Sequence, residues 1–245
     1  MKKINSLTGM IDLLGQKDNE SSQSDKIFST EKSLIKIFNN YSLNEIRTPA
    51  LEDEQLFNRS VGESSDIVNK ELYSFKDKNE KTISLRPEGT AGVARSIIEK
   101  KLENDLHRLW YLGPMWRYER PQKGRYRQFN QAGVELLGYE EGLAELEMIS
   151  MIISINSELN IKNPKIQINH LGDNKSKEEF CNDLKTFLEP HASNLDKRDF
   201  DRLYKNPLRI LDSKSKDTQE LLKNAPKISD YISQESFNML ETVKE

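Results

Sequence analysis

Two β-prone runs flank a short basic loop between residues 115 and 138. The first run reads MWRYER, the second reads RQFNQAGVELLG, and residues 120–127 join them. The second run alternates polar and apolar residues, which is typical of a strand with one face against a core. We therefore predict an antiparallel pair of strands. A separate strand, LHRLWYLG, is expected to come before the pair and to end at Gly113 and Pro114.

Positive charge is concentrated in this loop. Residues 117–129 contain five cations and one acid, whereas the whole chain has a formal net charge of −3. A basic block is usually a solvated surface, but the glycine, proline and aromatic residues within this one indicate a partner that carries phosphate. The net charge argues against a protein that coats nucleic acid over its whole surface, so we expect any such contact to be local.

Alternation also assigns the side chains of the two strands to faces. If Ala132, Val134 and Leu136 pack against the core with Trp116, the opposite face presents another set together: Arg117, Gln131, Gly133 and Glu135. An arginine, an amide and a carboxylate around a glycine suit a zwitterionic ligand or a phosphate. An ordinary solvated sheet face fits the same alternation equally well.

Glu88 places another carboxylate at a strand-to-helix junction. The strand TISLRPE ends there, and Gly89 follows at the start of a helix predicted over 89–102, where a ligand can approach the backbone. Alternatively, Glu88 is a first-turn acid that stabilises the helix dipole by about 0.3–1 kcal/mol. The sequence leaves both interpretations open.

The other segments predict further helices and strands. Apolar spacing predicts a helix that follows an N-cap at Ser24 and runs to about Tyr41. We also predict a hairpin over 72–88, a strand over 165–172 and a helix over 142–159. That last helix is expected to bury one stripe of side chains: Leu143, Leu146, Ile149, Ile152 and Ile153.

Composition and the scarcity of certain residues limit the class of protein. The single cysteine, Cys181, excludes an internal disulfide framework, and the three scattered histidines argue against a zinc site. No run approaches 18 apolar residues, and the N-terminal residues lack the features of a secretory signal. These features predict a cytoplasmic protein with no membrane partner. Beyond residue 172 charged helix-forming stretches dominate, which predicts a boundary there.

Three stretches resemble the histidyl-tRNA synthetase family of class II aminoacyl-tRNA synthetases: SLRPEGTAG (84–92), RLWYLGPMWRYERPQKGRYRQFNQAGVELLG (108–138) and NPLRILDSK (206–214). The resemblance implies an α+β fold in which an antiparallel sheet is flanked by helices. It implies that residues 1–172 are the N-terminal portion of a catalytic core with motifs 1 and 2. Residues 173–245 would then begin a helical insertion domain. In motif 1 of that family a proline, here Pro49, lies in a homodimer interface.

The resemblance also implies a reaction and its substrates. ATP, together with Mg²⁺, and histidine would give histidyl-adenylate and pyrophosphate, and the histidyl group would then pass to the 3′ end of its tRNA. No structural metal held by the protein is expected. The positions that match the family's histidine-binding residues are Glu88, Gly89, Thr90, Arg117, Gln131 and Glu135.

The remaining matched positions concern ATP and tRNA. Arg117 matches the motif 2 arginine that holds the α-phosphate and the amino-acid carboxylate, and it is therefore the predicted catalytic residue. Glu119 and Arg125 complete the predicted ATP site. The positions expected to meet the acceptor end of tRNA are Arg120, Gln122, Lys123, Arg125 and Arg127.

Some parts of the family have no counterpart in these 245 residues. They are motif 3, a second histidine-binding segment and an anticodon-binding domain, so we expect a truncated synthetase that forms adenylate poorly alone. One alternative is a non-catalytic relative, the regulatory subunit of ATP phosphoribosyltransferase in histidine biosynthesis. Another is a dimerising structural fragment without a ligand. The four cations from Arg120 to Arg127 favour the synthetase, because a regulator that never meets tRNA does not need them.

Overall fold

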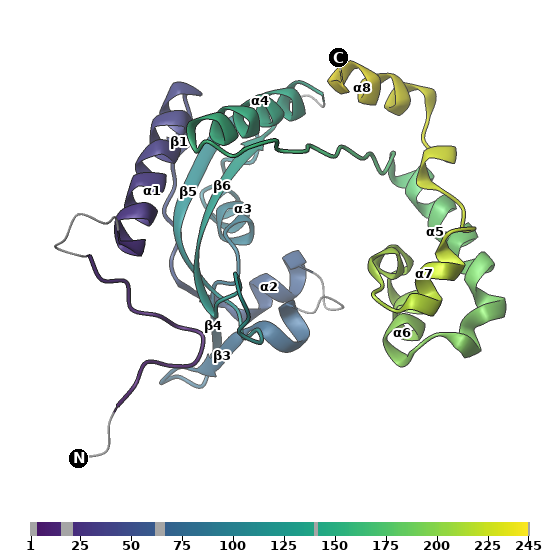
Figure 1. Cartoon of the computed structure of the whole chain (residues 1–245), viewed down its shortest axis with the longest axis horizontal. Coiled ribbons are helices and arrows are strands. Elements are labelled where there is room, and N and C mark those ends of the chain that lie inside the picture. Colours follow the sequence, from purple (N-terminus) through teal and green to yellow (C-terminus); the bar gives the residue numbers. More distant parts are fainter. Residues whose placement is uncertain (1–3, 16–21, 62–66, 140–141, 245) are drawn as a thin grey trace. The chain divides into compact units, whose positions relative to one another are not determined.

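The computed structural model describes residues 4–15, 22–61, 67–139 and 142–244 (Figure 1). Contacts within the chain divide it into two compact units, Met1–Pro164 and Lys165–Glu245. The functional boundary near residue 172 stays a prediction. Among the described residues, no helix combines the length and the apolar character that a membrane span requires.

The first unit is built on a three-stranded sheet in the order β1-β5-β6. Strand β1 (Asn44–Glu45) pairs in parallel with β5 (His107–Trp116), and β5 pairs antiparallel with β6 (Gln128–Leu137) along its whole length. The predicted antiparallel pair around the basic loop is confirmed. The predicted break at Gly113 and Pro114 is wrong, because β5 continues through both residues.

Hydrogen-bond direction explains why Pro114 is tolerated inside β5. The Pro114 carbonyl accepts a hydrogen bond from Nε of Arg86, and the N–H of Trp116 donates to the Arg86 carbonyl. These groups point away from β6, toward the edge where β1 has already ended. Proline therefore removes no donor from the ladder between β5 and β6.

A second sheet has the order β2-β4-β3. Its strands are β2 (Leu51–Asp53), β3 (Tyr73–Lys76) and β4 (Thr82–Leu85), and the antiparallel pairing of β3 with β4 confirms the predicted hairpin. Pro49 lies between β1 and β2. Two short helical elements were not predicted from the sequence: α2 (Glu54–Val61) and η1 (Ile67–Glu71).

Helices cover both faces of the first sheet (Figure 1). On one face, α1 (Gln23–Asn40) and α4 (Leu143–Glu158) bury Phe38 and Met151 against Trp110. On the other face, α3 (Thr90–Glu99) buries Val93 against Tyr111 and Met115. These elements confirm the α+β prediction. The core tryptophan is Trp110 and not Trp116, because Trp110 pairs directly with the inward-facing Val134.

The start of α1 corrects the predicted cap. The N-cap is Ser22, whose Oγ accepts a hydrogen bond from the N–H of Asp25, and the Asp25 carboxylate accepts one from the N–H of Ser22. A cap at Ser24 would place Ile27 at the third helical position, where an apolar side chain cannot return a hydrogen bond. The aspartate spacing therefore decides the helix start.

Helix α4 buries a different face from the predicted one. Leu143, Leu146, Ile152 and Ile153 are 66%, 36%, 46% and 54% exposed, whereas Met151 is 2% exposed. The helix is apolar around most of its circumference, so periodicity alone could not select a face. Polar contacts select it instead. Glu147 forms an ion pair with Arg108, and the Tyr41 hydroxyl bonds the hydroxyl groups of Ser150 and Ser154.

The second unit is helical and has its own core. Five fully buried side chains form that core: Phe180, Leu184, Leu188, Leu203 and Ile210. The described elements of this unit are α5 (Asn174–Leu188), η2 (Glu189–Asn194), α6 (Lys197–Lys205), η3 (Pro207–Asp212), α7 (Lys216–Leu222), η4 (Ile228–Asp230) and α8 (Gln234–Lys244). The predicted strand over 165–172 is wrong. Its residues pair with no strand among those described, and an extended segment needs such a partner.

Candidate active site

The N-terminus of α3 carries the first part of the candidate site. The Glu88 carboxylate accepts hydrogen bonds from the backbone N–H groups of Thr90, at 2.6 Å, and Ala91, at 2.9 Å. Glu88 thus satisfies two amides that a helix start leaves without intrahelical partners. Glu88 precedes the N-cap Gly89 and is therefore not a first-turn acid, but its carboxylate does bond the start of α3. Its predicted role in binding histidine stays a prediction.

Glu135 on β6 connects to the same helix start. The hydroxyl of Thr90 donates to Oε1 of Glu135 at 2.6 Å, and Thr90 itself is exposed, so a ligand can reach this pair. The pKa of the Glu135 carboxyl lies above its ordinary value. Burial is the main cause and the negative charge of Glu88 adds to it, while the hydrogen bond from Thr90 opposes both. Glu135 is therefore a partly desolvated carboxylate beside a second carboxylate.

Arg117 lies just beyond the end of β5. Its Nε–H donates to the Pro87 carbonyl at 2.9 Å, and its guanidinium carbon lies 5.2 Å from the centre of the Phe129 ring. Among the residues that the structure describes, no protein group bonds the two Nη atoms of Arg117. Its guanidinium is thus held at Pro87, the residue before Glu88, and its Nη–H groups can bind an anion.

Gln131 shares the face of β6 that bears Glu135. The side-chain oxygen of Gln131 is buried, and no group in the described part of the chain donates a hydrogen bond to it. A buried acceptor without a donor costs free energy until a ligand or water supplies one. We call the five residues of this face and helix start the polar cluster: Glu88, Thr90, Arg117, Gln131 and Glu135.

Tyr111 is the residue of this site that the sequence did not reveal. It pairs across the sheet with Gly133, and its ring fills the space that a side chain on Gly133 or Gly89 would need. A Cβ at Gly89 would lie 2.2 Å from Cε2 of Tyr111, and one at Gly133 would lie 2.1 Å from its Cζ. Burial also raises the pKa of the Tyr111 hydroxyl above its ordinary value. Side chains four residues apart in a strand share a face, so counting back from Met115 would have placed Tyr111 on the face of the polar cluster.

The basic loop closes as a small hairpin next to the polar cluster. Gln122 and Arg125 exchange backbone hydrogen bonds of 3.2 and 2.9 Å, and Gly124 takes the positive φ of +82° that this tight turn requires. The predicted RNA-facing residues Arg120, Gln122 and Lys123 are exposed. Arg125 lies 3.4 Å from a carboxylate oxygen of Glu119. These positions fit a solvent-facing contact surface, and their roles stay predictions.

The side chain of Arg127 makes two contacts with residues just before the loop. Its guanidinium carbon lies 3.8 Å from the centre of the Tyr118 ring, and its Nε–H donates to the Glu119 carbonyl at 3.0 Å. The predicted contact of Arg127 with tRNA is untested. Its observed contacts give it a positional task within the loop.

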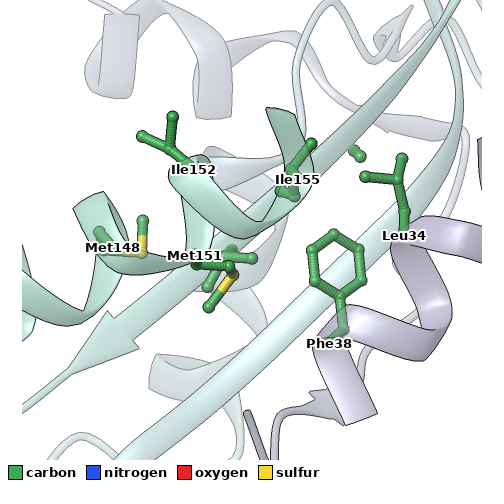
Figure 2. A pocket seen from close by; sticks show the side chains of 9 residues that line it. Leu34, Phe38, Met148, Met151, Ile152 and Ile155 are labelled. Carbon is green, nitrogen blue, oxygen red and sulfur yellow. The ribbon is translucent and has the colours of Figure 1, made fainter. Parts of the chain in front are cut away.

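Two further features lie outside the polar cluster. Figure 2 shows a pocket on the opposite face of the sheet, lined by apolar residues that include Leu34 and Phe38 of α1 and Met151 of α4. Such a lining supplies no acid, base or nucleophile. In the part of the chain that the structure describes, no three His, Cys, Asp or Glu residues form a group suited to a metal ion.

Comparison with known proteins agrees with this arrangement. A family model described as histidyl-tRNA synthetase matches residues 15–173. The histidine–tRNA ligase of Francisella philomiragia subsp. philomiragia is 44% identical over 244 residues, which are 98% of this chain and 56% of that protein. The corresponding ligase of Latilactobacillus sakei subsp. sakei is 46% identical over 230 residues, or 91% of this chain and 53% of that protein.

Solved structures give the same result. Apo histidyl-tRNA synthetase from S. aureus superposes with a TM-score of 0.76 at 35% identity, covering 99% of this chain and 54% of that one. A Bacillus halodurans protein, titled ATP phosphoribosyltransferase regulatory subunit/histidyl-tRNA synthetase, superposes with a TM-score of 0.62 at 20% identity, covering 100% of this chain and 67% of that one. This second likeness concerns the fold alone.

The fold around β5 and β6 is that of a class II aminoacyl-tRNA synthetase. Within that class, the chain belongs to the histidyl-tRNA synthetase family. The chain spans about half the length of the curated relatives that it matches.

Proposed function

We propose that the polar cluster binds histidine and ATP as part of a histidine–tRNA ligase. The observation that carries the proposal is the convergence of a partly desolvated Glu135, a buried Gln131 oxygen without a donor and the Arg117 fork around one helix start. Relatives named histidine–tRNA ligase support it, with 44% and 46% identity. The reaction would join the histidine carboxylate to the α-phosphate of ATP and release pyrophosphate. The histidyl group would then pass to the ribose hydroxyl at the 3′ end of tRNA, with release of AMP.

The carboxylates and the amide supply specificity for histidine in this proposal. Glu135 accepts an N–H of the imidazole ring, while Thr90 and the oxygen of Gln131 receive the α-ammonium group. Glu88 joins them, because a carboxylate that accepts two amides retains lone pairs for an ammonium group. A substrate without an imidazole N–H leaves Glu135 unpaired, and this penalty rejects it more strongly than pocket size alone.

Arg117 supplies the electrostatic part of the proposed reaction. Negative charge increases on the α-phosphate as the histidine carboxylate attacks it, so a fixed guanidinium stabilises the transition state more than the ground state. Glu119 and Arg125 lie on the ATP side. Mg²⁺ would arrive with the ATP phosphates, since this ion is usually held by substrate phosphates and few protein carboxylates.

The loop residues Arg120, Gln122, Lys123, Arg125 and Arg127 would contact the acceptor end of tRNA. We further propose a homodimer that includes the segment around Pro49, acting in the cytoplasm. Sedimentation of the purified chain at several concentrations measures the oligomeric state directly. A monomer at every concentration would contradict the dimer.

Replacing Lys123 and Arg125 together by alanine should weaken binding of a tRNA acceptor-stem hairpin. For B-DNA, each lost cation–phosphate contact lowers the magnitude of the slope of log K against log salt by about 0.9, and we expect a similar change for the duplex RNA stem. Fluorescence anisotropy at several salt concentrations measures this slope. Lys78 and Lys81, which lie in the β3–β4 turn region, provide a matched double substitution that should change nothing. An unaltered slope would remove the loop from the RNA contact.

Glu135→Ala should weaken histidine binding by about 1–3 kcal/mol, because a buried polar group of the ligand loses its partner. Isothermal titration calorimetry measures the affinity, and Glu103→Ala, at an exposed acid, is the control. Unchanged affinity would remove Glu135 from the site. If the unaltered chain binds histidine no better than leucine, the proposed function itself fails.

The raised pKa of Glu135 has a consequence for stability. Glu135 is protonated in both states below its ordinary value of 4.5, and its ionised form is disfavoured in the folded state, so stability falls as pH rises from 4.5 through the raised pKa. Glu135→Gln removes this loss. The stability of the variant relative to the original chain should therefore increase as pH rises above 4.5, as measured by urea unfolding at several pH values.

A further inference from the structure

The N-terminal strap, residues 4–15, is attached to the end of the basic loop. The Gly9 carbonyl accepts hydrogen bonds from the backbone N–H groups of Arg127, at 2.8 Å, and Gln128, at 3.4 Å. These two amides lie where the loop enters β6. Gly9 thus pairs donors that a strand end would otherwise leave to water.

Gly9 is suited to this contact in two ways. Its φ of +78° lies in the region that glycine adopts without a steric penalty. A Cβ there would also lie 2.8 Å from Cγ of Arg127 and 3.1 Å from Cγ of Pro121. The strap therefore contacts both arms of the loop, at Pro121 and at Arg127.

Arg127 also bonds Arg117 of the polar cluster. Its carbonyl accepts a hydrogen bond of 3.0 Å from the N–H of Arg117, while its side chain lies on Tyr118 and bonds the Glu119 carbonyl. One residue therefore joins the strap to the backbone of the predicted catalytic arginine and to the first residues of the loop.

Apolar burial contributes little to holding the strap. Ile4, Leu7 and Leu14 are 96%, 69% and 80% exposed, and Ile11 and Leu13 are 45% and 39% exposed. A segment with few buried apolar contacts opens locally at low free-energy cost, so its attachment depends on specific bonds such as those of Gly9.

We propose that Gly9 and Arg127 are positioning residues, through which the strap holds the basic loop and Arg117 in place. That the strap affects RNA binding rests on the proposed function, whereas the attachment of the strap to the loop does not. The geometry of the loop then depends on a segment that lies more than a hundred residues away in the sequence.

Gly9→Ala tests the proposal, and Gly15→Ala is its control because a Cβ at Gly15 meets nothing within 4 Å. We expect Gly9→Ala to accelerate hydrogen exchange at the Arg127 and Gln128 amides about tenfold, since an L-residue at positive φ is strained and opens the contact. The Arg127 Nε–H resonance should lose the ring-current shift from Tyr118. Amides in α5 should keep their rates, and Gly15→Ala should change none of these signals.

Two results would overturn the proposal. Exchange rates in Gly9→Ala equal to those in Gly15→Ala would show that the strap does not hold the loop. Faster exchange with an unchanged Arg127 Nε–H shift, and unchanged affinity for the acceptor-stem hairpin, would show a strap without a positioning task. An original chain that binds no hairpin would instead contradict the proposed function, while exchange and the Nε–H shift still decide the strap.

Discussion

Gly133→Ala is expected to lower the free energy of unfolding by about 3 kcal/mol, at the upper end of the usual cost of overpacking a core. The added Cβ would lie 2.1 Å from Cζ and 2.3 Å from the hydroxyl oxygen of Tyr111. The ring cannot move away freely, because its other side lies against Gly89. Urea unfolding followed by circular dichroism measures the effect.

A second substitution shows whether the loss of stability comes from the clash with Tyr111 or from any substitution in β6. Tyr111→Leu removes the ring atoms nearest to Gly133, so the double variant should lose less stability than the sum of the two single variants. Gly15→Ala should leave the unfolding midpoint unchanged, because its Cβ would point into open space. Additive losses in the double variant would contradict the packing of Tyr111 against Gly133.

Arg117→Ala is expected to slow the formation of histidyl-adenylate by about 100- to 1000-fold, the usual cost of removing one preorganised donor from a developing charge. This prediction rests on the proposed function. Arg117 is held by its Nε–H bond to Pro87, which leaves its Nη groups for the phosphate. Single-turnover formation of adenylate, with the chain in excess over labelled ATP and histidine, measures the rate.

Arg117→Lys serves as the comparison for this experiment. Lysine keeps the charge but loses the planar fork, so its rate should lie between those of the original chain and Arg117→Ala. Arg117→Ala should change the affinity for histidine less than it changes the rate, because Arg117 stabilises the negative charge that develops in the transition state. A rate in Arg117→Ala equal to that of the original chain would exclude Arg117 from catalysis. Unfolding curves check that the Pro87 contact is not needed for folding.

Local patterns predicted the part of the fold that surrounds the site. Alternation along residues 128–137 is enough to identify β6 and to place Gln131 and Glu135 on one face, because side-chain direction in a strand depends only on position. Helical periodicity failed to select the buried face of α4, which is apolar on several sides. Its orientation depends on the bonds of Glu147 with Arg108 and of Tyr41 with the α4 serines.

Two mistaken predictions have a related cause. Proline commonly ends a strand, yet Pro114 lies within β5 because its missing N–H faces away from β6, on the edge where β1 has already ended. The apolar alternation of residues 165–172 resembles a strand, but no neighbouring strand among the described residues pairs with it. A strand is decided by its neighbours as well as by its own residues.

The sequence by itself determined the antiparallel pair around the basic loop, the shared face of Gln131 and Glu135 and the family, because these depend on residue type and spacing along the chain. Only the tertiary structure decided that Tyr111 fills the space beside two glycines and that the Gly9 carbonyl bonds the N–H of Arg127. These contacts join segments far apart in the chain. Their partners are set by packing and hydrogen bonding between elements, which local patterns do not record.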